Sequence, residues 1–323
     1  MTTALPDYLE PLGDGLYAID TGFQRPRFDA AYLMTEAGRA CFIDTGTNHA
    51  VPRLLGALEA LGLPRDAVDY VIPTHVHLDH AGGAGLLMQS LPAARLVVHP
   101  RGARHLVDPR MLYAGALAVY GQAEMERSYG RLVGADAARV DASEDGMVLS
   151  LAGRPLRLID TPGHARHHHC VWDERTRGWF TGDTFGLSYR EFDLPGRAPW
   201  ILPTSTPVQF EPEAMRQSIE RMMAEQPQCM YLTHYGRVGD TPALAAELLL
   251  QLDAMVAIGE AHRTAPDRHE ALKAALRRLY AERLQAGGRR GDEAALSLLD
   301  LDVELNAQGL AVWLDRPAPR STP

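Results

Sequence analysis

The sequence has few cysteines, no long apolar run and no concentration of positive charge. Its three cysteines, Cys41, Cys170 and Cys229, are widely spaced and form no C-x-x-C pair, so neither a disulfide framework nor a thiolate metal site is predicted. No stretch approaches the roughly 18 to 20 uninterrupted apolar residues of a membrane span. The formal net charge of −9 opposes binding to a polyanion, because contacts with phosphates need clustered Lys and Arg. We therefore expect no nucleic-acid partner, no membrane partner and free, buried thiols.

What is present is enough for a globular protein. The chain has 323 residues, of which 46% are hydrophobic, and can bury a substantial core. Its first residues, MTTALPDYLEPLGDG, lack a basic region followed by an apolar stretch. A cytoplasmic location is the resulting expectation.

Short β-like runs alternate with helical segments over the first two-thirds of the chain. Helical spacing occurs at 51–61 and 84–91. This alternation predicts an α+β fold with mixed sheets and helices on the outside. The runs that predict strands are 16–20, 30–34, 40–44, 69–73, 95–99, 157–160, 170–173, 179–183 and 230–234.

Two segments depart from this alternation. Residues 101–135 are helical in pattern, carry Tyr and Met, and are predicted to be a helical insertion in a main domain of residues 1–240. Residues 241–315 show amphipathic helical periodicity, which predicts a helical C-terminal extension. Residues 316–323 are expected to be a disordered tail.

The stretch THVHLDHAGG concentrates metal-binding side chains directly after a predicted strand. His75 and His77 are two residues apart, so both can point to one side of an extended chain. Asp79 and His80 follow before a glycine pair that permits a tight turn. Imidazole and carboxylate suit zinc and neighbouring first-row metals, so this loop is a candidate metal site.

Further candidate ligands lie at the ends of later strands. His164 follows a strand in DTPGH, Asp183 closes WFTGD and His234 closes MYLTH. Loops at strand ends can hold side chains to a defined geometry. The sequence therefore supplies enough ligands for two metal ions.

The strings THVHLDHAGG, TPGH, FTGDT and LTHYG, in this order, resemble the pattern of the metallo-β-lactamase superfamily, and FIDTG around Asp44 resembles the segment that precedes it. The resemblance covers roughly residues 12–240. It implies an αβ/βα sandwich of two mixed sheets flanked by helices, with two divalent ions, zinc before iron or manganese. The implied ligands are His75, His77 and His164 for one ion and Asp79, His80 and His234 for the other, with Asp183 bridging them.

The resemblance also implies a reaction. Two ions sharing a water provide a hydroxide at neutral pH, which attacks an ester, lactone or thioester of a small to medium, partly apolar substrate. Asp79 and Asp183 are the candidate catalytic groups for moving the proton. The bridging Asp183 disfavours a true β-lactamase. The alternatives are a phosphodiester hydrolase, an iron-dependent redox protein on the same fold, and a regulator that keeps the metal site as structure.

Supporting and pocket residues are less clearly marked. Asp44 is expected to help orient the histidine loop, or else to cap its own turn, and the resemblance implies a supporting role for His168. His167 and His169 are expected to be ordinary strand or surface residues. The aromatic and basic residues expected to line a pocket for a small-molecule substrate, if they do not simply pack the helices, are Tyr113, Tyr120, Phe185, Tyr189 and Arg190. A homodimer built through the C-terminal helices is compatible with the pattern.

Overall fold

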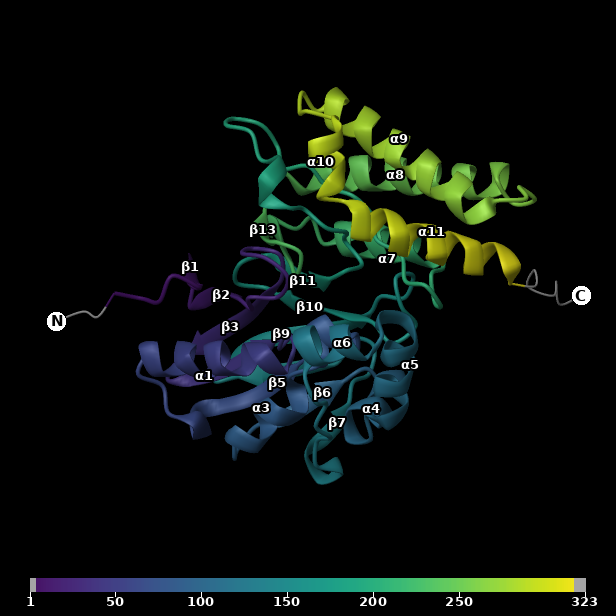
Figure 1. The fold of residues 1–323 in the computed structure, drawn as a ribbon. Helices are drawn as coiled ribbons and strands as arrows, with labels where there is room; N and C mark the ends of the chain where they lie inside the picture. The colour runs from purple at the N-terminus through teal and green to yellow at the C-terminus, as the bar shows by residue number, and fades with distance from the viewer. Residues whose placement is uncertain (1–3, 317–323) are drawn as a thin grey trace, which may run out of the picture.

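Two β-sheets lie face to face at the centre of the structure, a computed structural model that describes residues 4–316 (Figure 1). The expected disordered tail falls almost entirely outside the described residues. Helices cover the outer face of each sheet. The predicted fold class, two mixed sheets flanked by helices with a helical C-terminal region, is confirmed.

The first sheet contains seven strands in chain order. They are β1 (Leu9–Gly13), β2 (Leu16–Asp20), β3 (Ala30–Glu36), β4 (Arg39–Ile43), β5 (Val68–Ile72), β6 (Arg95–Val98) and β7 (Val140–Ala142). Neighbours from β1 to β4 are antiparallel, and those from β4 to β7 are parallel. Parallel neighbours need crossover connections, and the helices of these connections cover the outer face.

The second sheet contains six strands in the order β13-β12-β11-β10-β9-β8. They are β8 (Val148–Leu151), β9 (Arg154–Asp160), β10 (His169–Asp173), β11 (Gly178–Gly182), β12 (Cys229–Leu232) and β13 (Gly236–Val238). All pairs are antiparallel except β11 with β12. Strands β1, β7, β8 and β13 are missing from the sequence prediction, and two of them, β7 and β13, have only three residues each.

Along each central strand, successive side chains point alternately into the core between the two sheets and toward the helices on the outer face. On β3, Tyr32 and Met34 enter the core between the sheets, while Leu33 packs under the helices of the first sheet. On β12, Tyr231 enters the same central core and Met230 faces the opposite helical layer. This period of two fixes the register, because a shift by one residue would exchange the two faces.

The helices divide between the two outer faces. The crossover helices of the first sheet are α1 (Val51–Ala60), α2 (Leu78–Ala81), α3 (Ala84–Ser90) and α4 (Pro100–Val107), followed by α5 (Arg110–Tyr120), α6 (Gln122–Glu124) and the π-helical turn η3 (Met125–Tyr129). The second sheet is covered by α7 (Pro212–Ala224), α8 (Thr241–Ala261), α9 (Arg268–Ala286), α10 (Glu293–Ser297) and α11 (Asp300–Asp315). Short 3-10 turns are η1 (Asn48–Ala50), η2 (Arg65–Ala67), η4 (Ala137–Arg139) and η5 (Arg190–Phe192).

Helix α8 is long and apolar enough, by length and composition alone, to cross a membrane. In the structure its residues Leu244, Leu248 and Met255 belong to the same apolar cluster as Trp179 of the second sheet. One side of α8 packs against the second sheet within the protein. The C-terminal helices therefore extend the core over the second sheet.

Candidate metal centre

The candidate ligands meet at one edge of the sandwich because each follows the end of a strand. Strands β5, β9, β11 and β12 run in the chain direction toward this edge and then pass into loops. The segments after these strands carry the ligands: His75 and His77 in the loop after β5, Asp79 and His80 on the short helix α2 that follows it, His164 after β9, Asp183 after β11 and His234 after β12. The structure brings all seven side chains together in two neighbouring groups.

The first group consists of His75, His77, His164 and Asp183, whose candidate ligand atoms all lie within 4.8 Å of one another. His77 Nδ1 is 2.7 Å from His75 Nε2 and 3.2 Å from His164 Nε2. Burial, together with the neighbouring imidazoles, holds the pKa of His75 and of His77 well below the usual range. The rings are therefore neutral, and their lone pairs converge where a cation would be held.

The second group consists of Asp79, His80 and His234. His234 Nε2 lies 3.4 Å and His80 Nε2 lies 3.7 Å from Asp79 Oδ2. Burial opposes a charge on His234, but Asp183 and Asp79 outweigh it and raise its pKa to about 9. The carboxylates around His80 raise its pKa well above the usual value in the same way. Protons on these two rings balance the buried carboxylates, and a metal ion would displace them.

Asp183 joins the two groups. Its Oδ2 lies 3.2 Å from His164 Nε2, and its Oδ1 lies 3.3 Å from His80 Nε2 and 3.7 Å from His234 Nε2. Asp183 Oδ1 and His80 Nε2 are buried and have no hydrogen-bond partner among the described residues. Buried polar atoms without partners are costly, and a cation between them would satisfy both. This cluster of imidazole nitrogens and carboxylate oxygens is able to bind metal ions.

The outer nitrogens of three histidines are fixed by hydrogen bonds. The acceptors are Thr204 O for His164 at 3.1 Å, Phe28 O for His234 at 2.8 Å and Asp44 Oδ2 for His80 at 2.8 Å. Because Nδ1–H donates outward, Nε2 is the nitrogen that each ring offers to a metal ion, after loss of its proton in His80 and His234. The structure thus orients these rings before any ion binds.

Asp44 holds several ligand loops together. Its Oδ1 accepts hydrogen bonds from the backbone N–H of Thr74 at 2.7 Å and from the Thr74 hydroxyl at 2.9 Å. Its Oδ2 accepts from His80 Nδ1 and from the Thr233 hydroxyl at 2.7 Å. The carboxylate therefore connects the loops that follow β4, β5 and β12. These contacts go beyond capping its own turn, which was the alternative role expected from the sequence.

An Asp44→Asn variant is expected to bind zinc about 10- to 100-fold more weakly, because an amide cannot accept all four of these hydrogen bonds and His80 loses its fixed orientation. Competition with a chromophoric chelator measures the affinity. Asp20→Asn is the control, since Asp20 also accepts backbone N–H groups beside a strand end but lies outside both ligand groups. Equal zinc affinity of wild type and Asp44→Asn would show that Asp44 does not position His80.

The three consecutive histidines have different surroundings. His168 Nδ1 lies 2.9 Å from the Thr161 hydroxyl, and its Nε2 accepts the backbone N–H of Asp183 at 3.3 Å, so the ring supports the loop that carries Asp183. His169 Nε2 donates to a backbone carbonyl of the loop before His75 at 2.9 Å. His167 is buried and lines the pocket beside the ligands, which is not the ordinary position expected of it. Because the three histidines are consecutive, no periodic pattern in the sequence could predict which of them faces the pocket.

A pocket of about 640 Å³ reaches the ligand cluster. Five of the seven candidate ligands line it: His77, Asp79, His164, Asp183 and His234. Its walls come from the loop at 23–28, the helices of the 101–135 segment, the loop at 204–209 and α11. Apolar side chains dominate these walls, among them Phe23, Phe28, Leu112, Leu187 and Leu305.

The residues expected to line the pocket have different positions in the structure. Tyr189 lines the pocket. Phe185 is fully buried in the apolar core, Tyr113 packs against that core from α5, and neither is among the residues that line the pocket. The Arg190 guanidinium donates to the backbone carbonyl of Ser188 and pairs with Asp193, so it is engaged within the protein. The side chain of Tyr120 lies outside the described residues.

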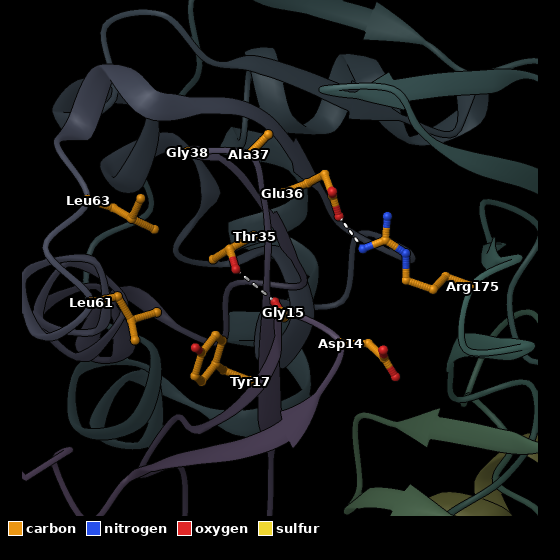
Figure 2. Close-up of a pocket in the computed structure, with 10 residues that line it drawn as sticks. All are labelled: Asp14, Gly15, Tyr17, Thr35, Glu36, Ala37, Gly38, Leu61, Leu63 and Arg175. Atoms are coloured by element: carbon orange, nitrogen blue, oxygen red, sulfur yellow. Dashed lines mark hydrogen bonds and ion pairs between the residues drawn. The ribbon is translucent and has the colours of Figure 1, made fainter.

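A second hollow, of about 280 Å³, lies at the opposite end of the first sheet, around the turn between β3 and β4 (Figure 2). It is lined in part by Tyr17, Leu61 and the ion pair of Glu36 with Arg175. No histidine is among its lining residues, so it offers no comparable chemistry.

A family model described as the metallo-beta-lactamase superfamily matches residues 13–234. The chain belongs to this superfamily. It is 27% identical over 248 residues to metallo-beta-lactamase fold-containing protein ST1585 of Sulfurisphaera tokodaii, a match that covers 74% of this chain and 84% of that one. The crystal structure of that archaeal superfamily protein, ST1585 from Sulfolobus tokodaii, aligns with a TM-score of 0.65 at 25% identity over 92% of this chain and 98% of that chain.

Three relatives are named as thioesterases, including a human and a fungal protein. The acyl-coenzyme A thioesterase MBLAC2 of Homo sapiens is 28% identical over 190 residues, which is 53% of this chain and 64% of the relative. The atrochrysone carboxyl ACP thioesterase of Aspergillus fumigatus is 29% identical over 154 residues, which is 47% of this chain and 38% of the relative. The chain thus spans less than two thirds of either thioesterase.

Proposed function

We propose that the protein is a hydrolase that uses two divalent ions, zinc in the first place, to cleave thioesters or related esters with an apolar acyl group. The observation that carries this proposal is the position of the metal-binding cluster, which lies against a pocket with mainly apolar walls. The thioesterase names among the relatives support the same substrate class.

The proposed ligand sets are His75, His77 and His164 for one ion and Asp79, His80 and His234 for the other, with Asp183 shared. When bound, such ions supply a water of lowered pKa and a Lewis acid for the substrate carbonyl. Asp79 and Asp183 are the carboxylates within the cluster that can take up the proton released when water attacks. The apolar walls exclude bulk water, which strengthens every electrostatic contact at the cluster.

The pocket mouth favours an apolar substrate over a phosphodiester. Three large apolar side chains that line the pocket are also exposed: Met111 (75%), Val208 (65%) and Leu301 (43%). Arg127 is the only Lys or Arg among the residues described as lining it, and Arg127 pairs with Glu124. A phosphate-bearing group at the reaction centre would therefore meet little positive charge from the protein.

The proposal is tested by elemental analysis together with a set of thioesters whose acyl chains have two, six and ten carbons. We expect about two zinc ions per chain and at least about tenfold higher kcat/KM for six carbons than for two, because each buried methylene contributes about 0.8 kcal/mol. Removing metal with a chelator should abolish hydrolysis, and added zinc should restore it.

Other outcomes would contradict the proposal. Turnover of bis-p-nitrophenyl phosphate with no thioester or ester hydrolysis would support the phosphodiesterase alternative. Iron with an optical band and no hydrolysis of any ester would support the redox alternative.

A further inference from the structure

A buried carboxylate lies in the apolar wall of the pocket, far along the chain from the metal-binding loops. Asp302 is in the first turn of α11, lines the pocket and is 5% exposed. The hydroxyl of Tyr189, another pocket residue, donates to Asp302 Oδ1 at 3.1 Å. This contact joins α11 to the loop that follows Asp183.

Asp302 has no ion-pair partner among the described residues. The nearest guanidinium in the same aromatic cluster, that of Arg25, lies over the rings of Tyr189 and Phe28 at 4.6 and 4.4 Å from their centroids. Arg25 donates to Glu191 at 2.6 Å. Burial raises the pKa of Asp302 to about 6, so the group is mostly ionised at neutral pH.

A structural role accounts for only part of this arrangement. An aspartate in the first turn of a helix is stabilised by the helix dipole. However, the neighbouring Asp300 occupies the same turn at the surface, pairs with Arg277 and requires no burial. A buried carboxylate with one side-chain donor keeps acceptor capacity, and Asp302 is among the residues that line the pocket.

We propose that Asp302, positioned by Tyr189, binds an uncharged N–H or O–H donor of the substrate at a distance from the bond that is cleaved. This inference rests on the proposed hydrolase function only in naming the ligand a substrate. The distance follows from the ring contacts, because Tyr189 stacks on Phe28 at 5.2 Å and Phe28 meets the His234 ring edge-on at 5.2 Å. The donor is uncharged because the Arg25 guanidinium already lowers the pKa of Asp302 and so partly balances the charge of this carboxylate.

Binding to metal-free protein tests this without any catalysis. The probes are non-hydrolysable S-hexyl thioethers in two matched pairs: an amide against its ketone, in which CH₂ replaces N–H, and an alcohol against its methyl ether. Calorimetry is expected to show at least one donor probe binding about tenfold more tightly than its partner, as for a hydrogen bond to a charged group. Asp302→Leu should remove this preference, and Tyr189→Phe should weaken it.

Asp300→Leu is the matched control, since it removes a carboxylate from the same helical turn without touching the pocket. Melting temperature is recorded for every variant. If Asp302 only stabilises α11, then Asp302→Leu lowers the melting temperature and leaves the ratio within each probe pair unchanged, which overturns the inference. A hexylammonium probe that binds more tightly than either uncharged donor also overturns it. Absence of esterase activity, by contrast, would affect only the proposed function.

Discussion

An Asp183→Ala variant is expected to lose hydrolytic activity by at least about 10³-fold and to retain less than half of the zinc of the wild type. The reason is geometric, because Asp183 contacts His164 of one ligand group and both His80 and His234 of the other. Removing it withdraws the proposed shared ligand and leaves His80 without its closest carboxylate on the cluster side. Zinc per chain and kcat on the best thioester are the two measurements.

The matched control is Asp160→Ala, which removes another strand-end carboxylate that contacts a histidine. Asp160 Oδ1 lies 3.0 Å from His99 Nε2, outside both ligand groups, so full zinc and activity are expected. Asp183→Asn separates ligation from proton transfer, because an amide can still coordinate through oxygen but cannot accept a proton. Full activity of Asp183→Asn with both ions bound would exclude the proton-transfer role.

An Arg154→Met variant is expected to lose about 3 to 5 kcal/mol of folding free energy. Arg154 and Asp173 are 1% and 0% exposed and form a two-pronged ion pair, with Nε and Nη2 at 2.8 and 2.5 Å from the carboxylate oxygens. The same guanidinium donates to the backbone carbonyl of Asp14 at 2.5 Å and so ties the β1–β2 turn to the second sheet. Without Arg154, Asp173 becomes a buried charge without a cation. Urea unfolding measures the loss.

The control for this variant is Arg175→Met, because Arg175 forms an exposed ion pair with Glu36 and should cost less than about 1 kcal/mol. In the double variant Arg154→Met/Asp173→Leu, stability should partly return, since no unpaired charge remains. Equal losses for Arg154→Met and Arg175→Met would contradict the argument.

The same pair predicts a pH dependence. Burial alone would raise the pKa of Asp173, but the hydrogen bonds from Arg154 and Thr176 outweigh it and lower the pKa. A carboxylate with a lowered folded pKa contributes stability above its unfolded pKa, near 3.9, and loses it as the pH falls through the folded value. Arg154→Met should therefore reduce the acid sensitivity that Asp173 confers.

The candidate ligands could be found in the sequence because each is in a short string beside a strand end. Local order alone predicts that His75 and His77 share a side, and the position of Asp183 after WFTG places it at the edge of a sheet. No such local rule connects Tyr189 with Asp302, which are 113 residues apart and meet only because α11 packs over the pocket.

The sequence also did not predict which way side chains point in irregular loops. Phe185 follows Asp183 by two residues, yet it turns into the core while Asp183 faces the ligands. Arg190 looked free to pair with a substrate, but its own chain supplies the partners, Ser188 and Asp193. Composition identifies such residues as candidates, and only tertiary packing decides their role.

Helix α11 contributes part of the pocket wall from a region of the chain distant from the candidate ligands. Leu301, Asp302 and Leu305 lie beyond the residues, 13–234, that match the family model, while all seven candidate ligands lie within them. Part of the pocket wall is therefore encoded outside the stretch that carries the candidate ligands, although most of the lining residues lie within that stretch. Mutations of Leu301 and Leu305 can reshape this wall without altering any candidate ligand, which makes α11 a suitable first target for changing what the pocket binds.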